Sequence, residues 1–359
     1  MCTAKNMKNR FFISSFENRI MHGDVMDCLK RIPTASIDCV VTSPPYWQLR
    51  NYGFKAQWGL EKTFSEYLNR LWKMMKELHR VLKDSGTVWI NLGDTFFGSG
   101  NGSGRSRNDF AQPLQKVKVG EIVPVKANTD KANNLPHKCL SLIPHRFAIG
   151  CIEQGWILRN DIIWAKPNSL PESVKDRFSK KHEHIFFFVK SPDYHFELDA
   201  VRDPHLAESH KRSLYSMTSY KSSNHRSKAP YGKGNELLRK KVKLNVLGKN
   251  PGDISDFWKI SNKGNHQKHY ATFNSELIEK PILAGCPKGG IILDPFCGTG
   301  TTGICTIELG RKFIGIDAKK EYCLMAKKNI DGVLKTFKAG NGEIQNLQSI
   351  IEKLMLLNF

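Results

Sequence analysis

The chain has 359 residues, the length of two average domains or of one large α/β domain with an insertion. It carries 55 Lys and Arg against 34 Asp and Glu, a formal charge of +21, and 40% of its residues are hydrophobic. That hydrophobic content supports a buried core and excludes a disordered chain. The charge favours a polyanionic partner, although a lysine-rich soluble protein would also carry it.

The cysteines and the lengths of the apolar runs indicate in which cellular compartment the protein is expected. The nine cysteines are odd in number and form no CxxC pair, which argues against a disulfide framework and a zinc ribbon. Every apolar run is far shorter than the ~20 residues of a membrane span. The short run at 11–13 has no cleavage-site pattern after it. These features predict a cytoplasmic protein without a metal site or a membrane partner.

Strands and helices alternate along the chain, which is typical of a doubly wound, mostly parallel α/β sheet. The apolar run Ile37–Val41 indicates a strand buried on both faces. An amphipathic pattern predicts a helix over 63–82, closed by Gly86. Strands are also expected at 20–22, 87–92, 160–165, 184–189, 290–293 and 312–316, and helices at 25–32, 144–154, 301–309 and 320–337.

Two segments interrupt this alternation. Residues 98–134 are rich in Gly, Ser and Asn at their start and weakly patterned afterwards, which predicts a mobile loop insertion. Residues 205–250 hold eleven Lys or Arg and two Glu, a net +9, with interleaved tyrosines. This basic stretch is expected to touch a partner. The tail 338–359 has apolar residues at helical spacing.

A Gly-rich turn opens with an acid at Asp294 and continues to Thr302, between a predicted strand and a predicted helix. It is neither GxGxxG nor a P-loop, so it does not indicate a pyrophosphate or triphosphate cradle. Asp317 follows 23 residues later at the end of the next strand, a place that suits ribose hydroxyls. Two acids favour a cationic ligand, and S-adenosylmethionine fits. The alternative is a plain tight turn with a buried capping Asp.

A second motif, Ser43-Pro44-Pro45-Tyr46, follows the buried strand at 37–41. Two prolines stop a central strand and leave a carbonyl free to accept a hydrogen bond. A planar amine could donate to the Ser43 hydroxyl and the Pro44 carbonyl while its ring stacks on Tyr46. A proline turn without a function is the alternative. No Pro is followed by Cys, so the Pro-Cys nucleophile of cytosine C5 methylation is missing.

Together these motifs resemble the bacterial amino-methylating DNA methyltransferases of the β permutation group, over roughly 19–200 and 266–337. Ser43–Tyr46 matches the catalytic motif, the turn at 294–302 the cofactor loop, and 313–317 the ribose-binding strand. The segment at 269–273 resembles the one over the methionine end of the cofactor, and Asp24 lies in a turn like that near its adenine. The resemblance implies a cofactor site of Asp24, Thr272, Phe273, Asp294, Pro295, Phe296, Gly298, Gly300 and Asp317.

Motif order and domain layout follow from the resemblance. The family places its target-recognition region between a catalytic half and a cofactor half, and the two halves build one crevice if their strands are neighbours. This predicts a catalytic half at 1–200, a basic recognition region at 201–265, a cofactor half at 266–337 and a helical tail at 338–359. Related enzymes that methylate protein glutamine have the glycine loop first, which speaks against that alternative.

The expected activity is methyl transfer to the N4 amine of cytosine in double-stranded DNA. Family members with Ser before the two prolines usually methylate cytosine, and those with Asp or Asn usually methylate adenine. Ser43 favours cytosine, and Trp47 is expected to narrow the pocket towards a pyrimidine. N6-adenine methylation is the alternative, followed by a basic DNA-binding module without catalysis. A cognate restriction endonuclease, without a stable complex, and a homodimer are both compatible with the resemblance.

Overall fold

The computed structural model describes residues 17–54, 57–98, 133–169, 172, 174–202, 255–261 and 274–336. The chain divides into two compact units, one formed by 1–197 with 256–359 and the other by 198–255. In the second unit the described residues include one short 3-10 helix, Asp199–Val201. The β-strands and α-helices described all belong to the first unit.

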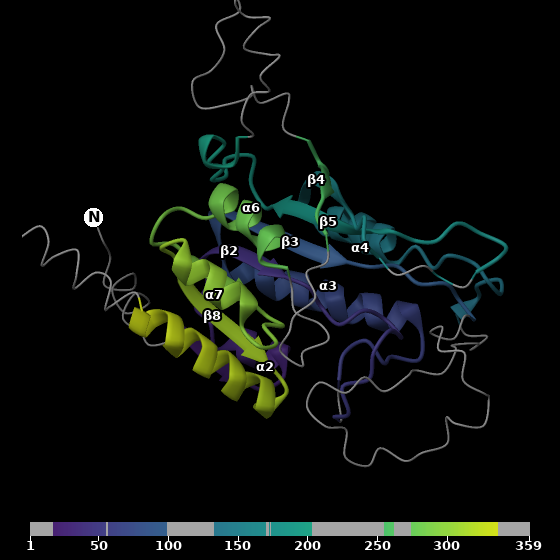
Figure 1. Ribbon diagram of the computed structural model, residues 1–359, viewed down its shortest axis with the longest axis horizontal. Coiled ribbons are helices and arrows are strands. Elements are labelled where there is room, and N and C mark those ends of the chain that lie inside the picture. The colour runs from purple at the N-terminus through teal and green to yellow at the C-terminus, as the bar shows by residue number, and fades with distance from the viewer. Residues whose placement is uncertain are drawn as a thin grey trace, which may run out of the picture. The chain divides into compact units, whose positions relative to one another are not determined.

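The first unit is built on one sheet of eight described strands in the order β1-β8-β7-β2-β3-β5-β4-β6 (Figure 1). Neighbouring strands are parallel except where β5 pairs with β3 and β4, so β5 alone among them runs the other way. This confirms the predicted mostly parallel α/β sheet. The strands are β1 (Arg19–His22), β2 (Ile37–Thr42), β3 (Leu82–Leu92), β4 (Ile157–Ala165), β5 (His182–Val189), β6 (Phe257–Lys259), β7 (Ile291–Asp294) and β8 (Lys312–Asp317).

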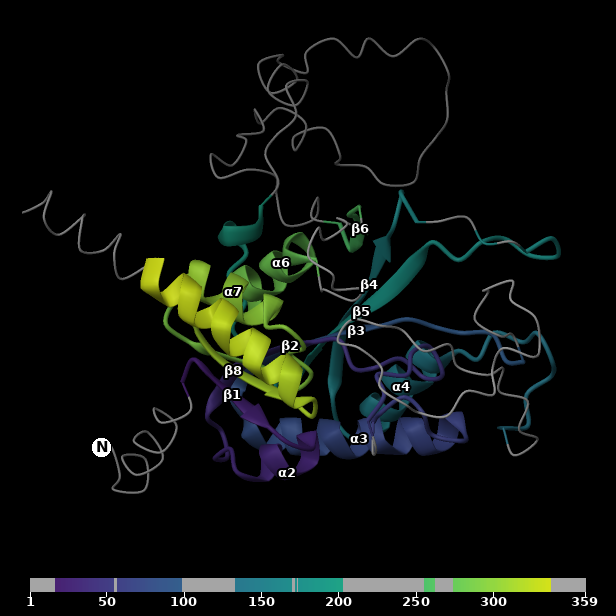
Figure 2. The same ribbon diagram turned by 60° about the horizontal axis from the view of Figure 1, so that its bottom comes forward.

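Helices cover both faces of the sheet. In Figures 1 and 2, α6, α7 and the helix of residues 320–336 lie on one face, while α2, α3 and α4 lie on the other. All six residues of β2 are buried because the strand is central and covered on both faces. The bounds are α2 (Val25–Lys30), α3 (Phe64–Val81), α4 (Ile143–Glu153), α6 (Ser275–Gly285) and α7 (Thr301–Glu308).

Helix α3 begins at a capping box, in which the Thr63 hydroxyl accepts the Glu66 N–H and the Glu66 carboxylate accepts the Thr63 N–H. Its end differs from the prediction. The helix passes directly into β3 at Leu82, which pairs with Ile37 of β2, and Gly86 lies inside β3. A Cβ at Gly86 would lie 2.6 Å from Leu82 Cγ, so the glycine serves strand packing and does not close the helix.

Several predicted features fall wholly or largely outside the described residues. They are the loop at 98–134, the basic stretch at 205–250 and the tail at 338–359. Within the predicted recognition region, residues 257–259 form β6, which pairs with β4 at the edge of the sheet. No helix in the described part of the chain is long and apolar enough to cross a membrane.

Candidate active site

Two strands far apart in the sequence end side by side. β2 and β7 are parallel neighbours, with Val40 opposite Leu293, as expected for the two motif-bearing strands. Their last residues are joined by a hydrogen bond of 2.6 Å from the Thr42 hydroxyl to Asp294 Oδ1. The Pro-Pro motif and the Gly-rich turn therefore emerge together at the carboxyl ends of these two central strands.

Asp294 fixes the shape of the Gly-rich turn. It is 3% exposed, and besides the Thr42 contact its oxygens accept the Phe296 N–H at 3.0 Å and the Thr302 hydroxyl at 2.6 Å. Burial raises the pKa of the Asp294 carboxyl to about 6, against the lowering effect of these hydrogen bonds. Asp294 thus joins β7, the turn and α7, as the capping interpretation predicts, and it also lines the cavity.

Two glycines of the turn adopt left-handed backbone angles, with φ of 52° at Gly298 and 85° at Gly300. A Cβ at Gly300 would lie 3.0 Å from Ala326 Cβ, so this glycine lets α7 approach the helix of residues 320–336. A Cβ at Gly298 would meet nothing within 4 Å. The backbone at Gly298 is therefore open to a ligand, whereas Gly300 serves packing and is not among the cavity-lining residues.

Asp317, the last residue of β8, closes the other side of the turn. Its Oδ2 accepts the Gly298 N–H at 3.0 Å, and its Oδ1 accepts the Lys319 N–H at 2.8 Å. Burial raises the pKa of the Asp317 carboxyl to about 6. The Asp317 carbonyl accepts the Gly23 N–H at 3.0 Å, which brings Asp24 to the same cavity.

The Pro-Pro motif presents two hydroxyl groups to a polar cluster. The Tyr46 hydroxyl lies 2.8 Å from Asn91 Oδ1 and 2.7 Å from Glu183 Oε2. Ser43 Oγ lies 3.4 Å from the Tyr46 oxygen and 3.5 Å from Asn91 Oδ1. Burial, and then the Glu183 carboxylate, raise the pKa of the Tyr46 phenol well above its usual value, so Tyr46 keeps its proton.

These groups surround one cavity of about 590 Å³. It reaches from the Gly-rich turn and Asp317 to the Pro-Pro motif and Glu183. Thr272 and Phe273 lie outside the described residues, so their predicted role stays a prediction. The predicted residues that line the cavity are Asp24, Ser43, Pro44, Pro45, Tyr46, Asp294, Pro295, Phe296, Gly298 and Asp317.

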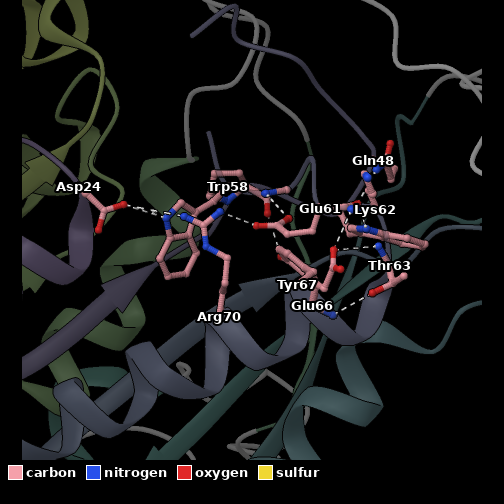
Figure 3. A network of polar contacts seen from close by, with 12 residues as sticks. Asp24, Gln48, Trp58, Glu61, Lys62, Thr63, Glu66, Tyr67 and Arg70 are labelled. Atoms are coloured by element: carbon pink, nitrogen blue, oxygen red, sulfur yellow. Dashed lines mark hydrogen bonds and ion pairs between the residues drawn. The ribbon is translucent and has the colours of Figure 1, made fainter. Parts of the chain in front are cut away.

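One wall of the cavity is held by a polar network centred on Arg70 of α3 (Figure 3). The Arg70 guanidinium pairs with Glu61 at 2.8 Å and lies over the Trp58 ring, 4.3 Å from its centroid. Trp58 Nε1 donates to Asp24 Oδ2 at 3.2 Å, and its ring meets the Phe296 ring edge-on at 5.4 Å. Figure 3 shows Asp24 in contact with both Trp58 and Arg70, whose Nη2 lies 3.8 Å from Asp24 Oδ2. The network fixes an aromatic edge beside the Gly-rich turn.

Trp47 does not take the place that the sequence suggested. It is 2% exposed, its Nε1 donates to the Glu61 carbonyl at 3.0 Å, and its ring packs edge-on against Phe64. It belongs to the core and is not among the cavity-lining residues. The expectation that Trp47 narrows the pocket is therefore wrong, because the Glu61 carbonyl and the Phe64 ring hold the indole in the core.

Sequence reasoning missed several polar residues of the cavity lining, among them Asn91, Lys166 and Glu183. Asn91 is a polar residue at the carboxyl end of a buried apolar strand, a signal that could have indicated a site. Nothing in the local sequence marks Lys166 and Glu183 as partners. They meet because β4 and β5 are antiparallel, with Trp164 opposite Glu183.

One group of possible metal ligands occurs among the described residues. Single ligand atoms of His145, Asp161 and His184 lie within 4.8 Å of one another. His184 Nδ1 is 2.9 Å from Asp161 Oδ1, so hydrogen bonding already accounts for that contact. None of the three lines the cavity.

The cavity fits the parts of S-adenosylmethionine. Asp317 lines the cavity with a carboxylate, the kind of group that suits ribose hydroxyls and a cationic ligand. The open backbone at Gly298 permits close approach, and the Trp58 and Phe296 rings give an apolar wall. Asp294, being internally hydrogen-bonded, shapes the turn more than it offers free acceptors.

The family is established by comparison with known proteins. The model of the N6/N4 methyltransferases, described as DNA methylase, matches residues 37–328. The chain therefore belongs to this family and is a DNA methyltransferase of the N6/N4 group. Methyltransferases of this family use S-adenosylmethionine, which confirms the predicted cofactor.

Particular relatives agree. The chain is 36% identical to the type II methyltransferase M.Cfr9I of Citrobacter freundii over 313 residues, 87% of each chain. It is 33% identical to M.SmaI of Serratia marcescens, covering 87% of this chain and 90% of the relative. A solved structure of the PvuII DNA methyltransferase (cytosine-N4-specific) is similar, with a TM-score of 0.55 and 19% identity over 88% of this chain and 90% of that one. That likeness shows the fold.

Proposed function

We propose that the protein transfers the methyl group of S-adenosylmethionine to the N4 amine of cytosine in double-stranded DNA. The observation that carries the proposal is the position of Ser43. It lines the cavity at the end of β2, beside the Gly-rich turn that follows the neighbouring strand β7. A target amine held at Ser43 and a cofactor held at the turn would share one cavity.

The cofactor-binding role is divided among several residues. S-adenosylmethionine supplies an electrophilic methyl group when bound. Asp317 would accept hydrogen bonds from ribose hydroxyls, and Asp24 would lie near the adenine. Phe296 would contribute an apolar wall. Thr272 and Phe273 are proposed at the methionine end by family resemblance alone.

The target base is held by the Pro-Pro motif. Ser43 Oγ and the Pro44 carbonyl would accept the two amine hydrogens, which aims the nitrogen lone pair at the methyl group. The transfer would be direct, without a covalent intermediate. The N–C bond would form as the C–S bond of the cofactor breaks, S-adenosylhomocysteine would leave, and one amine proton would pass to solvent. The base must first leave the duplex, which costs a few kcal/mol, and stacking on the Tyr46 ring would offset part of that. Gly93 packs against the same ring, because a Cβ there would lie 2.6 Å from Tyr46 Cε2.

The choice of cytosine rests on Ser43, because family members that methylate adenine usually carry Asp or Asn at this position. A hydroxyl accepts one amine hydrogen and occupies less space than a carboxylate or carboxamide. The PvuII neighbour is described as cytosine-N4-specific, and its likeness to this chain concerns the fold. N6-adenine methylation is the second candidate, since the reaction of the amine is the same.

DNA contact is proposed for residues 201–265, which include the +9 stretch. The similarity to type II methyltransferases supports a role in a restriction-modification system. A cognate endonuclease and a homodimer remain proposals from the resemblance. A DNA-binding module without catalysis is disfavoured, because Ser43, Tyr46, Asp294 and Asp317 line one cavity.

The test is the chemical identity of the product. The protein is expressed in a host that lacks its own DNA methylases, and genomic DNA is digested to nucleosides for mass spectrometry. N4-methylcytosine is expected, and Ser43→Ala should abolish it while cofactor binding persists. Finding N6-methyladenine alone would overturn the assignment of the base and leave the family unaffected.

A further inference from the structure

The cavity holds an ion pair to which no role has been assigned so far. Lys166 follows β4 and pairs with Glu183 of β5, and both side chains are largely buried, at 16% and 15% exposed. Lys166 Nζ also lies 4.1 Å from the Trp164 ring centroid. The second Glu183 oxygen accepts from the Tyr46 hydroxyl at 2.7 Å. The pair therefore contacts the Pro-Pro motif directly.

Counting protons around the Tyr46 hydroxyl shows what Glu183 does there. Tyr46 has one proton, while two acceptors, Asn91 Oδ1 and Glu183 Oε2, lie at 2.8 and 2.7 Å. Asn91 Oδ1 faces Tyr46 because Asn91 Nδ2 donates to the His184 carbonyl at 3.1 Å. A hydrogen bond to a carboxylate is roughly twice as strong as one to a neutral amide, so the Tyr46 proton goes to Glu183.

That choice sets the direction of the Ser43 hydroxyl. With the Tyr46 proton on the Glu183 side, the Tyr46 oxygen and Asn91 Oδ1 are both free to accept from Ser43, at 3.4 and 3.5 Å. The Ser43 proton then points into the protein and its lone pairs face the cavity. An amine presents hydrogens to Ser43, so only this arrangement suits it.

We propose that Glu183 is a positioning residue of the target-base subsite: by accepting the Tyr46 proton it keeps Ser43 Oγ a hydrogen-bond acceptor for the target amine, and Lys166 holds Glu183 in place. This rests on the proposed role of Ser43. Glu183 acts through Tyr46, so its loss should slow the methylation step and leave the affinity for the cofactor unchanged.

The isosteric change Glu183→Gln tests the direction of the hydrogen bonds that link Ser43, Tyr46 and Glu183. Lys166 can only donate, so it takes the amide oxygen of the new side chain and turns the amide NH2 towards Tyr46. Tyr46 must then donate to Asn91 and accept from the new amide. The Ser43 proton now competes with these shorter hydrogen bonds for the Tyr46 oxygen and Asn91 Oδ1, so it turns more often to the cavity. In the double variant Lys166→Met/Glu183→Gln the amide is free to flip, and its oxygen accepts from Tyr46 again.

The experiment measures single-turnover methylation of genomic DNA from a methylase-free host, together with cofactor affinity, DNA affinity and thermal unfolding. We expect E183Q to lower the methylation rate by about 100-fold, the usual order of loss when a reacting group is misplaced. The affinities should stay within threefold, and the double variant should regain at least tenfold. Asp84→Asn, which removes the carboxylate partner of Lys190 in an ion pair outside the cavity, is the matched control and should change nothing.

Three outcomes would overturn the proposal. They are an E183Q rate within threefold of wild type, a lost rate that the double variant does not recover, and a lost rate accompanied by weaker cofactor binding or a lower unfolding temperature. The product formed by the wild type is identified in parallel. If it is N6-methyladenine, the proposed base is wrong, yet the E183Q comparison still tests Glu183 because the target is again an amine.

Discussion

The Tyr67 hydroxyl donates a hydrogen bond of 2.8 Å to the backbone carbonyl of Pro45. Tyr67 is fully buried on α3, the longest described helix, so α3 contacts the Pro-Pro motif from the side of the core. Burial, with Glu61 second, raises the pKa of Tyr67 well above its usual value, which keeps it a donor. The turn that carries Ser43 and Tyr46 is thus fixed by the core.

Tyr67→Phe should loosen this turn. The Pro45 carbonyl loses its partner in a buried place, so the free energy of unfolding should fall by about 1–3 kcal/mol. Urea unfolding measures this, and the methylation rate should fall while cofactor affinity holds. Tyr194→Phe removes a hydroxyl that contacts the exposed Arg159 and serves as the control. Equal stability of the two variants would contradict the role given to Tyr67.

Arg70→Leu should disturb the aromatic wall of Figure 3. Breaking a fully buried pair costs about 3–5 kcal/mol, but Arg70 is 33% exposed, so a loss of roughly 1–3 kcal/mol is expected. Cofactor affinity should fall as well, because Trp58 loses its support next to Phe296. Calorimetry and urea unfolding check both effects. Lys30→Met, which breaks an exposed ion pair with Asp27, should have little effect.

Asp317→Ala should weaken S-adenosylmethionine binding. Without the carboxylate, the ribose hydroxyls lose their hydrogen-bond acceptor. The binding free energy should weaken by roughly 1–3 kcal/mol, which is about a 5- to 150-fold rise in Kd. Calorimetry measures the affinity, and thermal unfolding confirms that the variant folds. Asp331→Ala, on the exposed side of the helix at 320–336, is the matched control. Wild-type affinity in a folded Asp317→Ala protein would refute the assignment.

Cofactor affinity should also depend on pH through Asp317. Its pKa is raised from 3.8 to about 6 in the ligand-free protein, so the carboxyl takes up a proton as the pH falls through 6 and its attraction for a cation is lost. Affinity should drop below pH 6, and Asp317→Asn should flatten the profile. Stability of the ligand-free protein shows the opposite sign. Between pH 6 and 4 the folded state binds more protons than the unfolded chain, so this group favours folding as the pH falls.

Much of the fold could be predicted because it is local. Apolar runs such as Ile37–Val41 and the acid-opened glycine turn carry their own signal, and parallel strands place both motifs at one edge. The junction at Leu82 escaped prediction because the chain passes from helix to strand without a breaker. Helix α6 was not predicted, and its interior Pro281 obscures the pattern.

The site was predictable where one segment supplies it and not where two segments meet. Glu183 and Lys166 are 17 residues apart, and only the antiparallel pairing of β4 and β5 brings them together. The prediction that Trp47 narrows the pocket failed for the same reason, since the burial of Trp47 depends on the Glu61 carbonyl and on Phe64, which lie elsewhere in the sequence. Sequence spacing does not encode which surface a side chain will reach after a turn.

The last prediction concerns DNA binding by the basic region. Arg239-Lys240-Lys241 is the densest run of the +9 stretch at 205–250. Each phosphate contact adds about 0.9 to the slope of log affinity against log salt concentration, because bound DNA releases counterions. Replacing the three residues by Gln should therefore flatten the slope by as much as ~2.7 if all three contact phosphates. DNA binding is measured from low to moderate salt, with cofactor affinity as the internal control. The triple change Lys327→Gln, Lys328→Gln and Lys335→Gln, at exposed positions of the helix at 320–336, gives a matched loss of three charges elsewhere. An unchanged slope in the triple variant would mean that this run does not contact DNA.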